Sequence, residues 1–416
     1  MKLNNYNLIY NRNNFIILFF LFLILNYTFF NYRILFRENG YILGDWLINY
    51  NGGFVKRGLI GHLFFNLSKK LNISIIHIIF FFSTSIYIIT LIVLYRIIRD
   101  KLNIEIVLIF LFLPSTLLFN FFDPLTVGRK EILVLFFFSI YYIYLENDKY
   151  LYKITIYLLS IFFLLSHEIL FFQLPYLFLL RYLHLKKNDQ STFILKDYNL
   201  EILIFLSCFT LIFIIFIFTN YHDNNLLCKS LTEVGFTSDI CYGAINDQKL
   251  DKVISGLWQY FIERNYLFNY LVYTLFTMAP LVYVYYKTEN YLFKNKLIVL
   301  LLFCFLFSIL FLPRVNDWGR YLNLTFLLQF LIFLKFIEIG LIKKNPNLNF
   351  KKYLNIFLIL ILLTSWHMPH CCNPKLGDGY YDIYSRVKSR IYDESENSTK
   401  FKDLPRDTLR KLFKID

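Results

Sequence analysis

Charged and polar side chains that could do chemistry gather in five short segments, and long apolar stretches separate them. A carboxylate in such a segment can accept a proton from a hydroxyl group, and lysine or arginine can stabilise a departing phosphate. The five segments are 44–46 with 51–59, 123–124 with 128–131, 167–168, 316–320, and 367–370. Ionisable groups next to hydrocarbon are costly unless they have a function, which makes these segments the candidate site.

The segment around Lys56 and Arg57 gives the strongest single signal. The Asn-Gly-Gly element at 51–53 is typical of a turn where the backbone approaches another group closely. The apolar residues between 59 and 67 then predict an amphipathic helix lying in a membrane interface. Two cations beside helix N-terminal amides are suited to phosphate; alternatively, they contact lipid headgroups while Asp45 neutralises one of them.

Segment 128–131 holds Arg129, Lys130 and Glu131, close in the sequence to Asp123. Asp123 and Arg129 bracket a short loop, which favours a role in binding substrate. The alternative role is structural, because an acid such as Glu131 at the start of a helix stabilises the helix dipole.

His167 and Glu168 lie between two apolar helices. An acidic side chain in that position costs free energy, so we interpret both residues as functional. Segment 316–320 allows two interpretations. Trp318 suits the membrane interface, whereas Asp317 and Arg320 either bind substrate or simply pair with each other.

Segment 367–372 combines two histidines with two cysteines, which are suitable zinc ligands. Pro369 interrupts their spacing, so a disulfide or plain boundary residues are the preferred interpretation. No metal and no other cofactor are predicted. Cys228 and Cys241 lie in a long polar loop on the side where disulfides are permitted.

The composition indicates that a membrane positions these segments. Of the 416 residues, 57% are hydrophobic and only 17% are charged, and the mean hydropathy is +0.50. These values exclude secreted, cytosolic and disordered proteins and predict a polytopic integral membrane protein. A net charge of +14 would suggest nucleic acid as the partner of a soluble protein. Basic loops against anionic membrane lipid explain the charge here, and no nucleic acid partner is predicted.

We expect an all-α transmembrane helix bundle with about 11 spans (10 to 12). The expected spans are 14–32, 73–95, 104–122, 131–146, 151–167, 170–185, 200–219, 266–286, 297–312, 321–340 and 353–370. They form a single transmembrane domain, 1–370, with large outer loops at 33–72 and 220–264. The first of these loops carries interfacial helices, and a polar C-terminal tail follows at 371–416.

The distribution of lysine and arginine predicts a cytoplasmic N-terminus. This orientation places all five polar segments on the outer side of the membrane, where a shared site is the simplest explanation. The sequence has no Walker A, Gly-x-Ser-x-Gly or His-Glu-x-x-His motif. ATP-driven pumps, common hydrolases and zincins are therefore without support.

The layout resembles the C-type glycosyltransferase superfamily (GT-C), whose members have a first outer loop with a catalytic acid and interfacial helices. The resemblance rests on Asp45 in the first loop and on the loop 220–264 after the seventh span; Glu38 is a weaker match for the acid. It implies that Asp45 is the catalytic base. It also implies a polyprenyl-phosphate sugar donor and a glycan or lipid-linked acceptor, in a bacterial inner membrane.

The binding residues expected at that site are Lys56, Arg57, Arg129, Lys130, His167, Glu168, Asp317 and Arg320. Two other functions stay open. One is a polysaccharide polymerase of the O-antigen (Wzy-like) kind, and the other is a non-enzymatic flippase or transporter of lipid-linked glycans. A transporter would line its centre with polar residues, whereas the ionic residues here cluster at one face, which favours an enzyme.

Overall fold

The described part of the chain is entirely helical wherever it has regular structure. The computed structural model describes residues 2–37, 40–99, 111–146, 149–187, 195–219, 222–241, 243–245, 266–286, 291–310, 312, 315, 317–340 and 368–369. Within them, four helices are long and apolar enough to cross a membrane: Asn14–Leu35, Ile75–Arg99, Leu195–Thr219 and Trp318–Glu338. The chain is therefore an integral membrane protein with an all-α fold. The count of eleven spans stays a prediction, and the last span and the tail lie outside the described residues.

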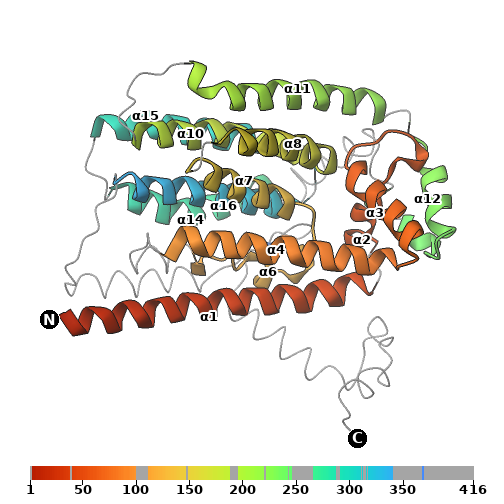
Figure 1. Cartoon of the computed structure of the whole chain (residues 1–416), viewed down its shortest axis with the longest axis horizontal. Helices are drawn as coiled ribbons and strands as arrows, with labels where there is room; N and C mark the ends of the chain where they lie inside the picture. Colours follow the sequence, from red (N-terminus) through yellow and green to blue (C-terminus); the bar gives the residue numbers. More distant parts are fainter. Residues whose placement is uncertain are drawn as a thin grey trace, which may run out of the picture.

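The long helices run side by side in one bundle (Figure 1). Their bounds are α1 Lys2–Leu35, α4 Ile75–Arg99, α7 Ile132–Tyr144, α8 Tyr150–Ser166, α10 Pro175–Lys187, α11 Asn199–Thr219, α14 Tyr266–Tyr286, α15 Tyr291–Ile309 and α16 Trp318–Glu338. Shorter elements are α2 Ile42–Leu47, η1 Tyr50–Gly52, α3 Gly58–Leu71, α6 Phe119–Phe122, η2 Pro124–Thr126, α9 Ile169–Gln173, η3 Leu195–Tyr198, α12 Asn224–Thr232 and η4 Ser238–Cys241. Helices α2, α3 and α12 lie together at one end of the bundle, which we call the site end.

Helix α16 occupies the centre of the bundle. Of its most apolar stretch, 89% is buried, and it contacts α7, α10, α14 and α15. Helices α1 and α11 lie at the periphery, where large apolar side chains such as Leu25 (71% exposed) and Phe213 (63% exposed) point outward. An apolar surface of this kind is stable only against lipid.

The third expected span, 104–122, does not continue as one helix through its described part. Residues 111 and 112 are helical, but turns follow from Pro114 until α6 begins. Proline cannot donate a backbone hydrogen bond, so it interrupts the helical pattern. Asn323 of α16 compensates, because its Nδ2 donates to the carbonyl oxygens of Ser115 (2.8 Å) and Thr116 (2.9 Å). The expectation of an unbroken span was wrong here for this reason.

The first expected loop contains the helices α2 and α3. Helix α3 packs on α2, α4 and α8 through Ile60 and Phe64, while Leu63 and Leu67 point outward. The apolar stripe predicted for this helix therefore divides into an inner and an outer face. The close approach predicted at the Asn-Gly-Gly turn is confirmed, because a Cβ on Gly52 would lie under 3.0 Å from the backbone oxygen of Asp223.

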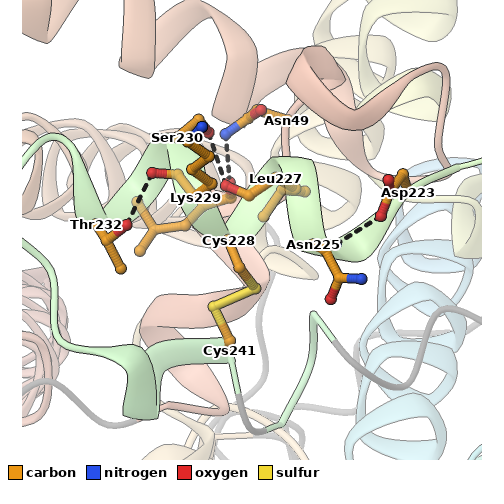
Figure 2. Close-up of a disulfide and its surroundings, with 10 residues drawn as sticks. Asn49, Asp223, Asn225, Leu227, Cys228, Lys229, Ser230, Thr232 and Cys241 are labelled. Carbon is orange, nitrogen blue, oxygen red and sulfur yellow. Dashed lines mark hydrogen bonds between the residues drawn. A yellow bond between two sulfur atoms is a disulfide. The ribbon is translucent and has the colours of Figure 1, made fainter.

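A disulfide joins Cys228 of α12 to Cys241 of η4 (Figure 2). The two cysteines are 13 residues apart, and α12 packs against η1 at the site end. Cross-linking a loop of this length stabilises a protein by about 3 kcal/mol, chiefly by restricting the unfolded chain.

We expect Cys228→Ser, Cys241→Ser and the double variant to lower the melting temperature in detergent equally, since each removes the same bond. A reducing agent should lower the melting temperature of the wild type to the same value. The free, buried Cys208 offers the control, because Cys208→Ala leaves this sensitivity to reductant in place. A wild type that is insensitive to reductant under denaturing conditions would show that the bond does not form.

Candidate functional site

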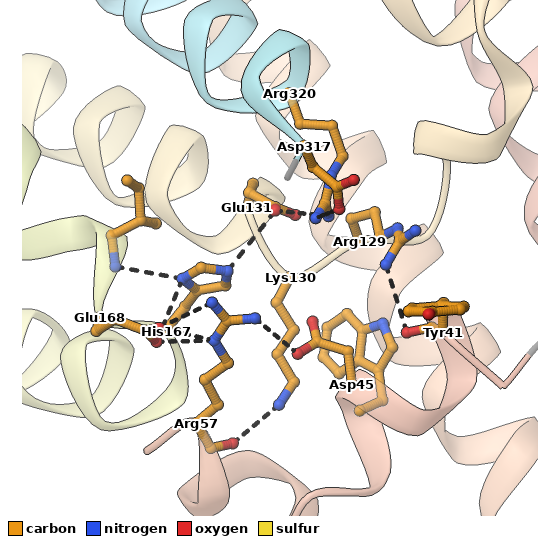
Figure 3. A network of polar contacts seen from close by, with 12 residues as sticks. Tyr41, Asp45, Arg57, Arg129, Lys130, Glu131, His167, Glu168, Asp317 and Arg320 are labelled. Carbon is orange, nitrogen blue, oxygen red and sulfur yellow. Dashed lines mark hydrogen bonds and ion pairs between the residues drawn. The ribbon is translucent and has the colours of Figure 1, made fainter. Parts of the chain in front are cut away.

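Four of the expected site residues or their neighbours are the N-cap residues of helices that begin at the site end. Arg57 precedes α3, Glu131 precedes α7, Glu168 precedes α9 and Asp317 precedes α16. Helix N-termini carry partial positive charge, which stabilises the three carboxylates. None of these side chains caps its own helix by a hydrogen bond. They turn instead toward one another and toward neighbouring cations (Figure 3).

Arg57 is the centre of the first group of ion pairs. Its Nε donates to Glu168 Oε1 (3.0 Å) and Oε2 (2.8 Å), its Nη2 donates to Oε1 (2.8 Å), and its Nη1 donates to Asp45 Oδ1 (3.3 Å). All three side chains are at most 12% exposed. Burial would raise the pKa of Glu168, but the charge of Arg57 outweighs it and holds that pKa well below its usual range. Arg57 has a φ of 63°, a left-handed conformation that the surrounding contacts must maintain.

Lys130 joins the first loop to the loop before α7. Its Nζ donates to the backbone oxygen of Arg57 (2.9 Å), and its ammonium lies 5.7 Å from the centre of the Trp46 ring. Trp46 Nε1 in turn donates to the backbone oxygen of Gly128. Burial would raise the pKa of Asp45, but the charges of Lys130 and Arg57 lower it, so Asp45 is a carboxylate.

Burial also lowers the pKa of Lys130 from 10.5 to about 8. Between these two values the unfolded chain binds the proton more tightly than the folded chain, so raising the pH through this window stabilises the folded state. We expect the melting temperature of the wild type, relative to Lys130→Met, to rise between pH 7.5 and 9.5. Melting curves of the two proteins that shift in parallel would contradict the buried position of this ammonium.

The second group of ion pairs lies around Glu131. Its Oε1 accepts a hydrogen bond from Arg320 Nη1 (2.8 Å), and Arg320 also pairs with Asp317. His167 is fully buried, with Nε2 at 3.7 Å from Glu131 Oε1. Burial would raise the pKa of Glu131, but Arg320 and then His167 hold it well below its usual range. His167 Nδ1 also lies 3.8 Å from Glu168 Oε2, so the two groups form one network of charged residues at the site end.

A cavity of about 60 Å³ borders the second group. Its lining combines the polar side chains of Arg129, Glu131, Arg320 and Asn323 with aromatic and aliphatic side chains of α1, α4, α7 and α16. Three buried atoms of these residues have no hydrogen-bond partner: Arg129 Nε, Arg320 Nε and Glu131 Oε2. Such atoms are rare in native proteins unless water or a ligand satisfies them. The volume holds about four water molecules or one phosphate-sized group.

The structure brings most of the expected site residues together in this network. The expected residues that belong to the network are Asp45, Arg57, Arg129, Lys130, His167, Glu168, Asp317 and Arg320. Arg129 lies at the rim of the network, where its Nη1 donates a 3.4 Å hydrogen bond to the backbone oxygen of Tyr41. Lys56 is half-buried at the edge, where its backbone N–H donates to Thr219 Oγ1 (3.2 Å). Its charge is close enough to contribute to the low pKa of Glu168.

Glu131 stands in the centre of the network, although the sequence suggested it only as a helix cap. The signal that could have identified it is its position directly after two cations at the start of an apolar helix. Glu168 has a similar position directly after His167. The histidines and cysteines of 367–372 lie outside the described residues. Among the residues that are described, no three His, Cys, Asp or Glu side chains form a group that could hold a metal ion.

Comparison with known proteins adds no relative to this picture. No protein-family model, no curated protein and no solved structure matches the chain.

Proposed function

We propose that this protein is a membrane glycosyltransferase that moves a sugar from a polyprenyl-phosphate donor to a glycan or lipid-linked acceptor. The observation that carries the proposal is the pair of buried guanidinium nitrogens, Arg129 Nε and Arg320 Nε, which have no partner and border the cavity. Guanidinium groups are the preferred protein ligands of phosphate.

The surroundings of the cavity favour an anion with an apolar chain. The N-termini of α7 and α16 lie beside it, and both favour negative charge. The lining also includes Tyr27, Tyr87, Leu91 and Leu327, which are compatible with the start of a hydrocarbon chain. In this proposal the phosphate occupies the cavity beside the arginines, and the rest of the prenyl chain extends beyond it into the lipid.

The reaction needs a group that accepts the proton of the attacking hydroxyl and groups that stabilise the departing phosphate. Arg129 and Arg320 stabilise the negative charge of the departing phosphate. Two carboxylates are placed to serve as base: Asp45, which the resemblance to GT-C enzymes favours, and Glu131, which borders the cavity. No cofactor is required. In this proposal the protein lies in a bacterial inner membrane with its N-terminus in the cytoplasm and the site end outside.

The test is a deletion of the coding sequence in the source strain, complemented with wild type, Asp45→Ala or an Arg129→Met/Arg320→Met double variant. We expect a sugar missing from otherwise finished glycan, restored only by the wild type. Lys69→Met, at the far end of α3, is the matched control for loss of a cation and should restore the sugar. An unchanged glycan in the deletion strain would contradict the proposal, and intact precursors held on the cytoplasmic face would indicate a flippase.

A second function, polymerisation of lipid-linked glycans, is favoured by a separate groove of about 550 Å³ between α3, α8 and α11. The groove is mostly apolar, and Leu59 and Leu165 in its wall are close in sequence to Arg57 and Glu168. A second lipid chain lying there would bring a second lipid-linked glycan to the same network. Single, unjoined repeats in the deletion strain would support the polymerase over the transferase.

A further inference from the structure

The two carboxylate oxygens of Glu131 have different surroundings (Figure 3). Oε1 accepts a hydrogen bond from Arg320 Nη1 (2.8 Å) and faces His167 Nε2 at 3.7 Å. Oε2 is buried and has no hydrogen-bond partner, although Glu131 borders the cavity. A buried acceptor without a donor is destabilising. The arrangement therefore calls for a ligand that enters the cavity and donates a hydrogen bond to Oε2, as a sugar hydroxyl does.

His167 lies beside this carboxylate. The backbone N–H of Ile169 donates to His167 Nδ1 (3.2 Å), which makes Nδ1 an acceptor. Nε2 is therefore the ring nitrogen that carries a proton, and it lies 3.7 Å from Glu131 Oε1. Arg320 thus binds Oε1, whereas His167 Nε2 lies near Oε1 without a hydrogen bond and Oε2 has no partner. The ring of Tyr321 packs edge-on against His167, with 6.3 Å between the ring centres, and restricts its rotation.

Asp45 has a different role in the same network. It pairs with Arg57, and it is not among the residues that line the cavity. Its carboxylate therefore faces the cations that organise the loop, whereas Glu131 faces the space that a substrate would enter.

We propose that Glu131 is the general base for the acceptor hydroxyl and that binding of the donor phosphate at Arg129 and Arg320 prepares it for this role. This inference rests on the proposed glycosyltransferase function. The hydroxyl gives its proton to Glu131 Oε2 while its oxygen forms a bond to the anomeric carbon. The bond between that carbon and the phosphate oxygen breaks, and its electron pair leaves with the polyprenyl phosphate.

The coupling between the two substrates follows from Arg320. In the structure the charge of Arg320 is committed to Glu131 and Asp317, and a carboxylate so strongly paired is a weak base. A bound phosphate shares the charge of Arg320, which raises the pKa of Glu131 and strengthens it as a base. The acceptor is therefore activated only when the donor is already in place.

The experiment compares Glu131→Gln, Glu131→Asp and Asp45→Asn in proteoliposomes containing lipid extract of the deletion strain. Turnover is measured as release of undecaprenyl phosphate from synthetic undecaprenyl-phosphate hexoses, and binding is measured with undecaprenyl phosphate alone. We expect Glu131→Gln to lower kcat by about 10²- to 10⁴-fold with little change in donor KM and with binding retained. Glu131→Asp should keep part of the activity. Formate, a small carboxylate, should partly restore Glu131→Ala.

Asp45→Asn should instead change KM and kcat together, because it loosens Arg57 and the loop. Full turnover in Glu131→Gln, combined with loss of turnover in Asp45→Asn, would overturn the inference and leave the transferase intact. Absence of both turnover and undecaprenyl phosphate binding in the wild type would contradict the proposed function itself. Melting temperatures of all variants separate loss of chemistry from loss of folding.

Discussion

Replacement of Arg57 by methionine is expected to destabilise the folded protein more than any single change at an exposed position. Arg57 contacts both Glu168 and Asp45, which are almost completely buried. Methionine has a similar length but no charge, so it leaves Glu168 buried without its main cation and removes one of the two cations beside Asp45. Breaking a buried ion pair in this way costs about 3–5 kcal/mol, a large fraction of the stability of a typical domain. The measurement is the melting temperature and the monodisperse yield in detergent.

A second substitution distinguishes this mechanism from simple loss of packing. Arg57→Met combined with Glu168→Gln should recover part of the loss, because the double variant no longer buries the carboxylate of Glu168. Arg57→Lys should lie between the wild type and the methionine variant, since lysine keeps the charge but cannot bind one carboxylate through two nitrogens. A double variant that is less stable than Arg57→Met would show that the charge of Glu168 is not the cause.

Replacement of Gly61 by alanine is expected to prevent α3 from packing. A Cβ at this position would lie under 3.0 Å from the backbone oxygens of Ile48 and Trp46. Backbone atoms cannot turn aside as a flexible side chain can, so α3 would have to move away from the segment after α2. Because Arg57 directly precedes α3, such a shift would also separate the ion pairs. We expect little folded protein, measured as monodisperse yield.

Gly44→Ala is the matched control, since it makes the same chemical change in a neighbouring helix. Its nearest neighbour would be the Ile240 oxygen at 3.4 Å, an ordinary contact. Alanine also has the higher helix propensity. Normal yield for Gly44→Ala and loss of yield for Gly61→Ala would place the effect in the close backbone approach. Equal yields for both variants would show that α3 can shift without cost.

The sequence was informative where local chemistry decides the structure. Runs without a charged residue, such as 202–219, predicted long apolar helices, and the glycines at 52 and 53 indicated a close backbone contact. The polar segments could be grouped because each stands at the end of an apolar run, and alternate ends of successive spans meet on one side. That reasoning places His167 and Arg320 on the same side of the membrane without any contact being known.

Other features depend on contacts between distant residues, which no local pattern contains. The turns after Pro114 are tolerated because Asn323 satisfies the carbonyl oxygens nearby, more than 200 residues later in the chain. The role of Glu131 was hidden for a similar reason. A cap and a substrate ligand are the same residue type at the same position, and only the cavity and the partnerless Oε2 tell them apart.

The long sequence separation between Glu131 and Arg320 has a consequence for how a cell makes this protein. The two residues are 189 positions apart, so at ordinary rates of translation Arg320 emerges about 10 to 40 s after Glu131. Throughout that interval the nascent chain presents a carboxylate at the membrane without the arginine that neutralises it. We therefore expect chains that stop before α16 to fold incompletely around Glu131, because they lack its partner.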